Sequence, residues 1–204
     1  MTLKRKEASD AVTDLGWRLV LGAFRAYVPA SSIADAARIA LSAAEIGDER
    51  LRIDVRADGV HLTIEVHASR VGAAEVELAK ALSAALPTTP DGVQAIELGI
   101  DAMDIPAVLP FWEAVLAYER VGDALVDPAG LGPAVWFQQM DEPRRQRNRI
   151  HFDVSVPHDQ TEARIAAALA AGGTLVYDKE APAFWVLADP EGNEACVTCW
   201  QGRD

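Results

Sequence analysis

The second half of the chain contains an internal repeat, and this feature restricts the fold more than any other. Residues 125–130 read LVDPAG and residues 187–192 read LADPEG. An apolar strand pattern follows each copy, at residues 134–139 and at residues 194–200. A segment that recurs together with its surroundings indicates two copies of one supersecondary unit, which pack together to bury their apolar faces.

Each copy also starts in the same way. A strand pattern begins at residues 96–98 and leads into a helix pattern over residues 105–118. A second strand pattern begins at residues 150–152 and leads into a helix pattern over residues 161–171. We therefore predict two βαβββ units in tandem over residues 93–204, with a ligand cleft between them.

A short segment rich in proline precedes the repeat. Residues 87–92 read PTTPDG, and two prolines with a glycine can continue neither a helix nor a central strand. This segment predicts a boundary between two domains, residues 1–88 and residues 93–204. Each domain is long enough to bury a small core.

The first domain carries both helix and strand patterns. Residues 17–28 read as one strand, and residues 51–56 and 60–67 alternate apolar and polar side chains around an Asp-Gly turn, as in a half-buried hairpin. Helix patterns lie before, between and after these strands, the last at residues 72–86. We predict an antiparallel sheet with helices on one face, so the fold class of the chain is α+β with two domains.

The charge balance limits the partners. The 204 residues include 31 acidic and 19 basic side chains, for a formal net charge of −12, and such a field repels a nucleic acid backbone. We find no apolar run long enough for a membrane span, no secretory signal and no disulfide framework. We therefore expect a cytoplasmic protein without nucleic acid or membrane partners. The basic run at residues 144–149 is either an anion clamp or a solvated connector.

Three sequence elements of the second domain form a recognisable set. They are Asp104 with Phe111-Trp112, residues 148–153 (NRIHFD) and residues 189–194 (DPEGNE). Over nearly all of residues 93–201 this set resembles the vicinal-oxygen-chelate superfamily, in particular its glyoxalase-like and bleomycin-resistance-like members. The resemblance implies a small-molecule ligand and a divalent metal, which His and Glu side chains from four strands hold and which polarises substrate oxygens.

The resemblance assigns candidate metal ligands position by position. Glu97 falls at the first ligand position, Gln138 at the second and His151 at the third, and His151 is also a candidate catalytic residue. Cys196 stands at the fourth position, which holds a carboxylate in the superfamily, and Glu194 lies two residues earlier on the same strand face. This set differs from the usual His and Glu ligands, and a coordinating thiolate favours zinc over magnesium.

Large aromatic side chains near the expected cleft are candidates for ligand contact. They are Trp112, Trp136 and Trp185, with Glu194 as a polar contact, and the alternative is that the indoles pack in the core. The sequence CVTC at residues 196–199 does not predict a redox site, because residues three apart on a strand point to opposite faces.

The first domain holds a second recognisable set of residues. They are Trp17, Phe24, Ala44-Glu45, residues 60–63 (VHLT), His67 and Glu75. Over residues 10–86 this set resembles pterin-4a-carbinolamine dehydratases, whose acid–base groups are a His-His-Pro stretch and a later histidine. His67 matches the later histidine and is the candidate catalytic residue. Glu49, Arg50 and Leu51 occupy the His-His-Pro positions, and a guanidinium cannot exchange protons near neutral pH, so the sequence argues against dehydratase activity.

Several functions stay open on the sequence alone. The leading one is a glyoxalase-like small-molecule-binding protein or a lyase- or isomerase-type enzyme that uses the C-terminal cleft. The alternatives are a 4a-hydroxytetrahydropterin dehydratase and a non-catalytic protein that sequesters a ligand. The polar strand face with His61 and His67 is either a remnant pterin site or a solvated surface, and His151 is either a ligand or a structural residue.

Because sheets of the dehydratase type pair between subunits, we expect a homodimer or a higher homo-oligomer.

Overall fold

The computed structural model describes residues 2–66, 71–143, 151–199 and 201–202. The chain divides into two compact units, residues 1–95 and residues 96–204. No helix within the described ranges is long and apolar enough to cross a membrane. The candidate His67 and the basic run at residues 144–149 lie outside the described residues.

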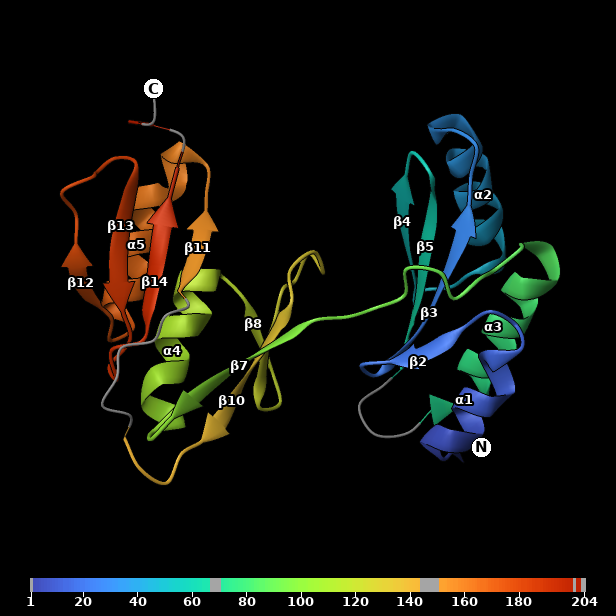
Figure 1. Cartoon of the computed structure of the whole chain (residues 1–204), viewed down its shortest axis with the longest axis horizontal. Helices are drawn as coiled ribbons and strands as arrows, with labels where there is room; N and C mark the ends of the chain where they lie inside the picture. Colours follow the sequence, from blue (N-terminus) through green and yellow to red (C-terminus); the bar gives the residue numbers. More distant parts are fainter. Residues whose placement is uncertain (1, 67–70, 144–150, 200, 203–204) are drawn as a thin grey trace. The chain divides into compact units, whose positions relative to one another are not determined.

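The first unit contains a four-stranded antiparallel sheet with the order β2-β3-β5-β4 (Figure 1). A short separate pair joins β1 to β6. Its elements are β1 (Thr2–Leu3), α1 (Arg5–Thr13), β2 (Arg18–Val20), β3 (Ala23–Pro29), α2 (Ile33–Ile46), β4 (Leu51–Arg56), β5 (Gly59–Glu65), β6 (Val71–Gly72) and α3 (Ala73–Ala85). This is the predicted antiparallel sheet with its helices.

All three of these helices lie on one face of the sheet (Figure 1). Phe24 and Leu62 point from the sheet into the core, where Val12 of α1, Ala36 of α2 and Leu82 of α3 are also fully buried. Because side chains alternate along a strand, the residues on either side of Phe24 and Leu62 project from the opposite face. The first unit is therefore a two-layer arrangement in which no described helix covers the second sheet face.

The strand predicted over residues 17–28 is interrupted. Leu21 and Gly22 have φ values of 49° and 68° and form the tight turn between β2 and β3. The prediction of one continuous strand was wrong because leucine rarely adopts a positive φ, so the apolar run concealed the turn. The hairpin predicted around Asp58-Gly59 is present as β4 and β5.

The second unit contains two sheets of identical topology. Their strand orders are β7-β10-β9-β8 and β11-β14-β13-β12, and in each the first strand runs parallel to the fourth. The elements are β7 (Glu97–Ala102), α4 (Ile105–Leu116), β8 (Glu119–Val121), β9 (Ala124–Val126), β10 (Ala134–Gln139), β11 (Phe152–Ser155), the 3₁₀ helix η1 (His158–Gln160), α5 (Thr161–Ala170), β12 (Thr174–Tyr177), β13 (Phe184–Ala188) and β14 (Glu194–Thr198). The two predicted βαβββ units, called the first and second repeat below, and the α+β fold class are confirmed.

One apolar core joins the two repeats. Phe111 and Trp112 of α4 are buried and contact each other edge to face, with ring centroids 5.4 Å apart. The same core includes Leu125 from the first repeat and Ala168 and Leu187 from the second. The repeats therefore fold as one body rather than as two separate modules.

The turn motif of the second repeat is built around the carboxylate of Asp189, which is only 2% exposed. Its Oδ1 accepts hydrogen bonds from the backbone N–H groups of Glu191 and Asn193, each at 2.9 Å. Its Oδ2 accepts from the side-chain amide of Asn193 at 2.8 Å and from the indole N–H of Trp112 at 2.9 Å. A buried carboxylate with four donors is well satisfied, so the turn is held firmly against α4.

Glu191 extends this link to the start of α4. Its carboxylate accepts from the backbone N–H groups of Met103 at 2.8 Å and Asp104 at 2.6 Å. The matching Asp127 of the first repeat closes its own turn, for example through the backbone N–H of Leu131 at 2.8 Å. The DPEGN sequence is therefore a structural connection between the repeats.

Candidate functional site

Three side chains with metal-ligand chemistry meet at the sheet of the second repeat. His151 immediately precedes β11, Asp153 lies on that strand, and Cys196 of β14 is the register partner of Asp153. The Nδ1 atom of His151 is 3.6 Å from the Sγ of Cys196 and 3.2 Å from an Oδ atom of Asp153. One donor atom from each residue lies within 4.8 Å of the other two. We refer to these three residues as the His-Asp-Cys cluster.

The His-Asp-Cys cluster is closed on one side and open on the other. Cys196 is 7% exposed, whereas the side chains of His151 and Asp153 are 50% and 61% exposed. Imidazole nitrogen, carboxylate oxygen and thiolate sulfur are the ordinary ligands of zinc, so this donor set fits a zinc-type ion. Within the described ranges, no other three His, Cys, Asp or Glu side chains come together in this way.

Asp153 is the member of the cluster that the sequence analysis missed. The NRIHFD element contains it, but no ligand position fell on it. Asp153 lies two residues after His151, so strand alternation places both side chains on the same face. This spacing was visible in the sequence and could have identified Asp153 as a candidate ligand. Its position beside Cys196 follows from the pairing of β11 with β14, which a single sequence does not reveal.

Glu97 and Gln138 belong to the sheet of the first repeat. Glu97 is the first residue of β7 and pairs with Ala134, whereas Gln138 of β10 pairs with Asp101. Four residues along a strand correspond to about 13 Å, so this register separates Gln138 from Glu97. Neither residue belongs to the His-Asp-Cys cluster, and the Gln138 amide donates to the Gln139 carbonyl at 3.3 Å. The structure thus brings together His151 and Cys196 of the predicted ligand set, but it does not place Gln138 beside Glu97.

The candidate ligand-contact residues have different environments. Trp112 is 1% exposed and bonded to Asp189, so it is part of the core. Trp136 is 39% exposed and Trp185 is half-buried. Glu194 is half-buried on β14 and, by alternation, faces the same side as Cys196. Of these four residues, Glu194 is the one that shares a sheet face with the cluster.

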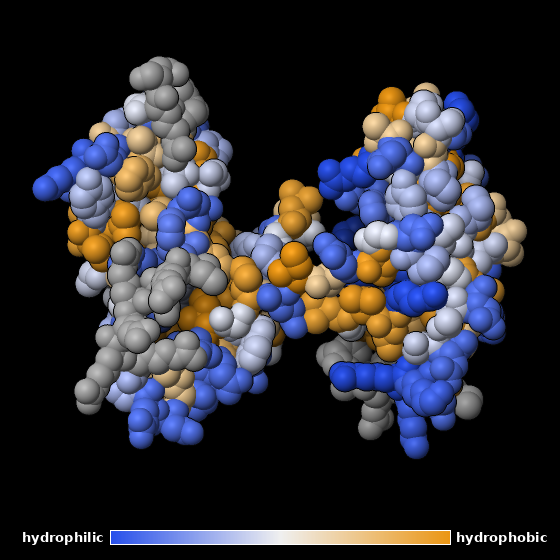
Figure 2. Space-filling model, in the orientation of Figure 1, coloured by the Kyte–Doolittle hydropathy of each residue, from blue (hydrophilic) through white to orange (hydrophobic). Residues whose placement is uncertain are grey.

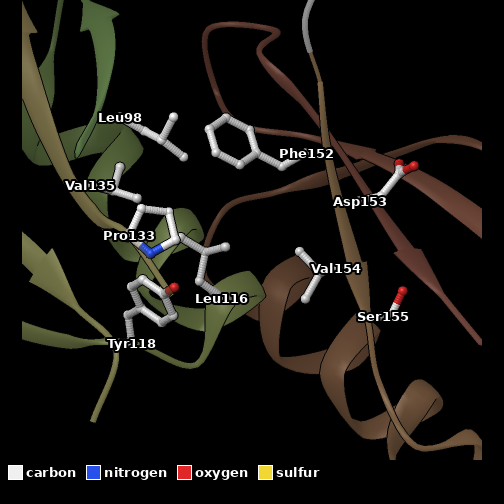
Figure 3. A pocket seen from close by; sticks show the side chains of 9 residues that line it. All are labelled: Leu98, Leu116, Tyr118, Pro133, Val135, Phe152, Asp153, Val154 and Ser155. Carbon is white, nitrogen blue, oxygen red and sulfur yellow. The ribbon is translucent and has the colours of Figure 1, made fainter. Parts of the chain in front are cut away.

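A pocket of about 300 Å³ lies between the first strands of the two repeats, and β11 forms one of its walls. Its lining residues come from both repeats: Leu98, Leu116, Tyr118, Pro133, Val135, Phe152, Asp153, Val154 and Ser155. Figure 3 shows the apolar side chains turned toward one another, while the carboxylate of Asp153 and the hydroxyl of Ser155 point away. Burial raises the pKa of Tyr118, and the Asp127 carboxylate adds to this rise, so the phenol is a hydrogen-bond donor at neutral pH. The pocket is therefore an apolar space on the face of β11 opposite to the cluster.

The position of Arg50 bears on the dehydratase alternative. Its guanidinium pairs with the carboxylate of Asp48 and lies 3.5 Å from that of Glu75. The hydrogen bond to Asp48 raises the pKa of Arg50 above its already high ordinary value. Arg50 is thus a permanently charged group in ion pairs, and it cannot replace a histidine that exchanges protons.

The sequence profile of a family described as a glyoxalase-like domain matches residues 97–198, which is half of the 204 residues. The matched region contains both repeats and the His-Asp-Cys cluster. A search of curated proteins gave no match.

Several solved structures are similar to about half of the chain. A possible glyoxalase from Bacillus cereus is 16% identical, with 53% of this chain and 100% of that chain covered and a TM-score of 0.43. A glyoxalase/bleomycin resistance protein/dioxygenase family enzyme from Burkholderia phytofirmans PsJN is 20% identical, with 50% and 95% covered and a TM-score of 0.41. The fosfomycin resistance protein FosX from Listeria monocytogenes is 9% identical, with 52% and 90% covered and a TM-score of 0.43. All three TM-scores are below 0.5, so the family assignment rests on the sequence profile.

Proposed function

The chain belongs to the glyoxalase-like domain family, and we propose that its second unit binds a small molecule beside a divalent metal held by His151, Asp153 and Cys196. One observation carries this proposal: a nitrogen, an oxygen and a sulfur donor lie within 4.8 Å of one another. The soft thiolate and the imidazole favour zinc, because magnesium prefers an all-oxygen environment. His151, Asp153 and Cys196 would hold such an ion, and a small molecule with an oxygen donor would bind beside them.

Each residue of the cluster has a definite part in this arrangement. His151 offers the Nδ1 lone pair of its neutral imidazole, and Cys196 offers its sulfur as the thiolate. Asp153, whose carboxylate already contacts the His151 ring, supplies a negatively charged oxygen. When bound, a divalent metal would supply Lewis-acid polarisation of a substrate oxygen.

The exposure of the cluster fits a ligand that arrives from solvent. His151 and Asp153 form the open side, and the buried Cys196 forms the floor. Glu194, on the same face of β14, is the residue that we assign to a polar contact with the ligand. The function that we propose is a lyase- or isomerase-type reaction on a small molecule with an oxygen donor. A protein that holds its ligand without converting it would use the same site.

Metal analysis of the purified full chain tests this proposal. After incubation with zinc and dialysis, we expect about one zinc per chain in the wild type and a loss of bound zinc in Cys196→Ser and His151→Ala. Cobalt substitution gives a second readout, because a thiolate ligand produces a sulfur-to-cobalt charge-transfer band that Cys196→Ser removes.

Cys199→Ser is the matched control. Cys199 is also buried, but its thiol contacts the carbonyl oxygen of Pro182 at 3.0 Å and does not belong to the cluster. The control variant should keep its zinc. A wild type that retains no metal, or equal zinc loss in both cysteine variants, would exclude the proposed site. Turnover that requires bound zinc would separate an enzyme from a sequestering protein.

A further inference from the structure

One row of residues crosses all four strands of the sheet in the first unit. In the antiparallel register Arg18 of β2 lies opposite Arg25 of β3, Arg25 lies opposite Thr63 of β5, and Thr63 lies opposite Arg52 of β4. Residues that pair directly across strands project from the same face. The row therefore reads Arg, Arg, Thr, Arg on the sheet face that points away from the helical core.

Three cations in one row require compensation. Side chains directly opposite each other on neighbouring strands are about 5 Å apart, and like charges at that spacing are destabilising. Arg18 and Arg25 form such a pair, whereas Arg52 lies one strand further from Arg25, beyond Thr63. The chain as a whole carries a formal net charge of −12, so three arginines in line are a local exception. The hydrogen-bond acceptors and carboxylates near each arginine decide whether the positive charge of the row is neutralised within the protein.

The outer two arginines have partners. The guanidinium of Arg18 donates to the carbonyl oxygens of Thr13 at 2.9 Å and Trp17 at 2.7 Å. Arg52 lies 3.5 Å from the carboxylate of Glu65, and both side chains are about half exposed, at 45% and 57%. Neither contact saturates a guanidinium, which has five N–H donors.

Arg25, in the middle of the row, is poorly satisfied. Its Nε is buried and has no hydrogen-bond partner among the residues that the structure describes. Its Nη1 reaches the hydroxyl of Thr63 at 3.4 Å, which is long for a hydrogen bond. No ion pair within the described part of the chain includes Arg25.

The electrostatic environment agrees with this geometry. Burial lowers the pKa of Arg25, the neighbouring charge of Arg52 lowers it further, and Glu65 offsets part of the effect. The positive charge of Arg25 is thus held in an environment that disfavours it. A bound anion would supply both the missing acceptor for Nε and the missing negative charge.

We propose that this row of Arg18, Arg25, Thr63 and Arg52 binds the oxyanion group, phosphate or carboxylate, of a small-molecule ligand. The planar fork of Arg25 can donate two parallel hydrogen bonds to such a group, and the Thr63 hydroxyl and Arg52 lie on its other side. This site is independent of the metal site proposed in the second unit, because it lies in the first unit and shares no residue with it.

The experiment uses the full chain with inorganic phosphate and, separately, acetate as probes at constant ionic strength. Binding is followed by calorimetry and by the NMR signal of the arginine Nε–H groups. We expect saturable binding in the wild type, with a shift of the Arg25 Nε–H signal, and the stronger of the two probes identifies the anion. Arg25→Gln should weaken that binding by at least about tenfold, since a charge-assisted pair is lost.

Two further variants distinguish a binding site from a structural role. Arg38→Gln removes an arginine of α2 whose side chain is 72% exposed, and binding should be unchanged. Glu65→Gln removes the carboxylate that competes for the row, and binding should become tighter. If Arg25→Gln does not fold, Arg52→Gln replaces it with the same expectation. Absence of saturation by either anion, or equal affinity in wild type and Arg25→Gln, would overturn the proposal, as would equal weakening by Arg38→Gln.

Discussion

Replacement of Asp189 by asparagine tests the link between the two repeats. The substitution keeps the size of the side chain and one carbonyl-type oxygen, but it exchanges the second oxygen for an NH₂ donor. The bonds from the backbone N–H groups of Glu191 and Asn193 to Oδ1 can persist. The bonds to Oδ2 from Trp112 and from the Asn193 amide become contacts between two donors.

The magnitude follows from the burial of these donors. A hydrogen bond to a charged group contributes about 1.5–3 kcal/mol to stability. The indole of Trp112 is 1% exposed and loses its acceptor completely, whereas the half-buried Asn193 recovers part of its loss from water. We therefore expect Asp189→Asn to lower the free energy of unfolding of the second unit by about 2–4 kcal/mol.

Urea unfolding of the full chain, followed by circular dichroism and tryptophan fluorescence, measures this change. The control is Asp123→Asn, at an exposed position of the first repeat, which should change stability by less than about 0.5 kcal/mol. A double-mutant cycle with Trp112→Phe should give a coupling energy of about 1–2 kcal/mol. A loss below about 1 kcal/mol in Asp189→Asn, or a coupling near zero, would show that the carboxylate does not carry the link.

Three further results are expected. The full chain should not dehydrate a 4a-hydroxytetrahydropterin above background, because Arg50 cannot act as an acid–base group; turnover that His67→Ala abolishes would contradict this. Hydrogen bonds from the backbone N–H and hydroxyl of Ser31 lower the pKa of Asp35 in the folded chain from its usual 3.8. The ionised Asp35 carboxylate therefore stabilises the fold above pH 3.8, and this contribution is lost as pH falls through the lower pKa of the folded state. Asp35→Asn should then be destabilising in urea at pH 7, and its cost should decrease as pH falls below 3.8. A cost that does not change over this pH range would refute the assignment. The chain should also self-associate, because Leu175 of the edge strand β12 is 46% exposed and the surface over β12 and β13 is largely hydrophobic (Figure 2). Sedimentation that shows only a 21.9 kDa monomer would exclude this self-association.

The overall architecture was predictable because it depends on local patterns that occur twice. The two Asp-Pro turns and the strand patterns after them set the order of elements in each repeat, and the strand predicted at residues 134–139 is present as Ala134–Gln139. The α4 helix ends at Leu116, before the predicted residue 118, because Ala117 adopts a left-handed conformation. A left-handed residue that is not glycine gives no signal in the sequence.

The composition of the site was only partly predictable, because it depends on strand pairing. Alternation along a single strand can show that His151 and Asp153 share a face. It cannot show that Asp153 pairs with Cys196 or that Gln138 pairs with Asp101, which are properties of parallel registers between distant segments. The ligand set predicted from the sequence therefore contained two of the three clustered residues, His151 and Cys196. It also contained Glu97 and Gln138, which the pairing of β7 with β10 does not place opposite each other.

The turn around Asp189 also determines which residues of β14 face the cluster. The backbone N–H of Asp189 donates to the carbonyl of Asn193 at 2.9 Å, and β14 begins at the next residue. A shift of one residue in this turn would exchange the two faces of the strand. Ala195 would then leave the core, and Cys196 would turn away from His151. The buried carboxylate therefore connects the packing of the two repeats to the chemistry of the site, because the same turn fixes both.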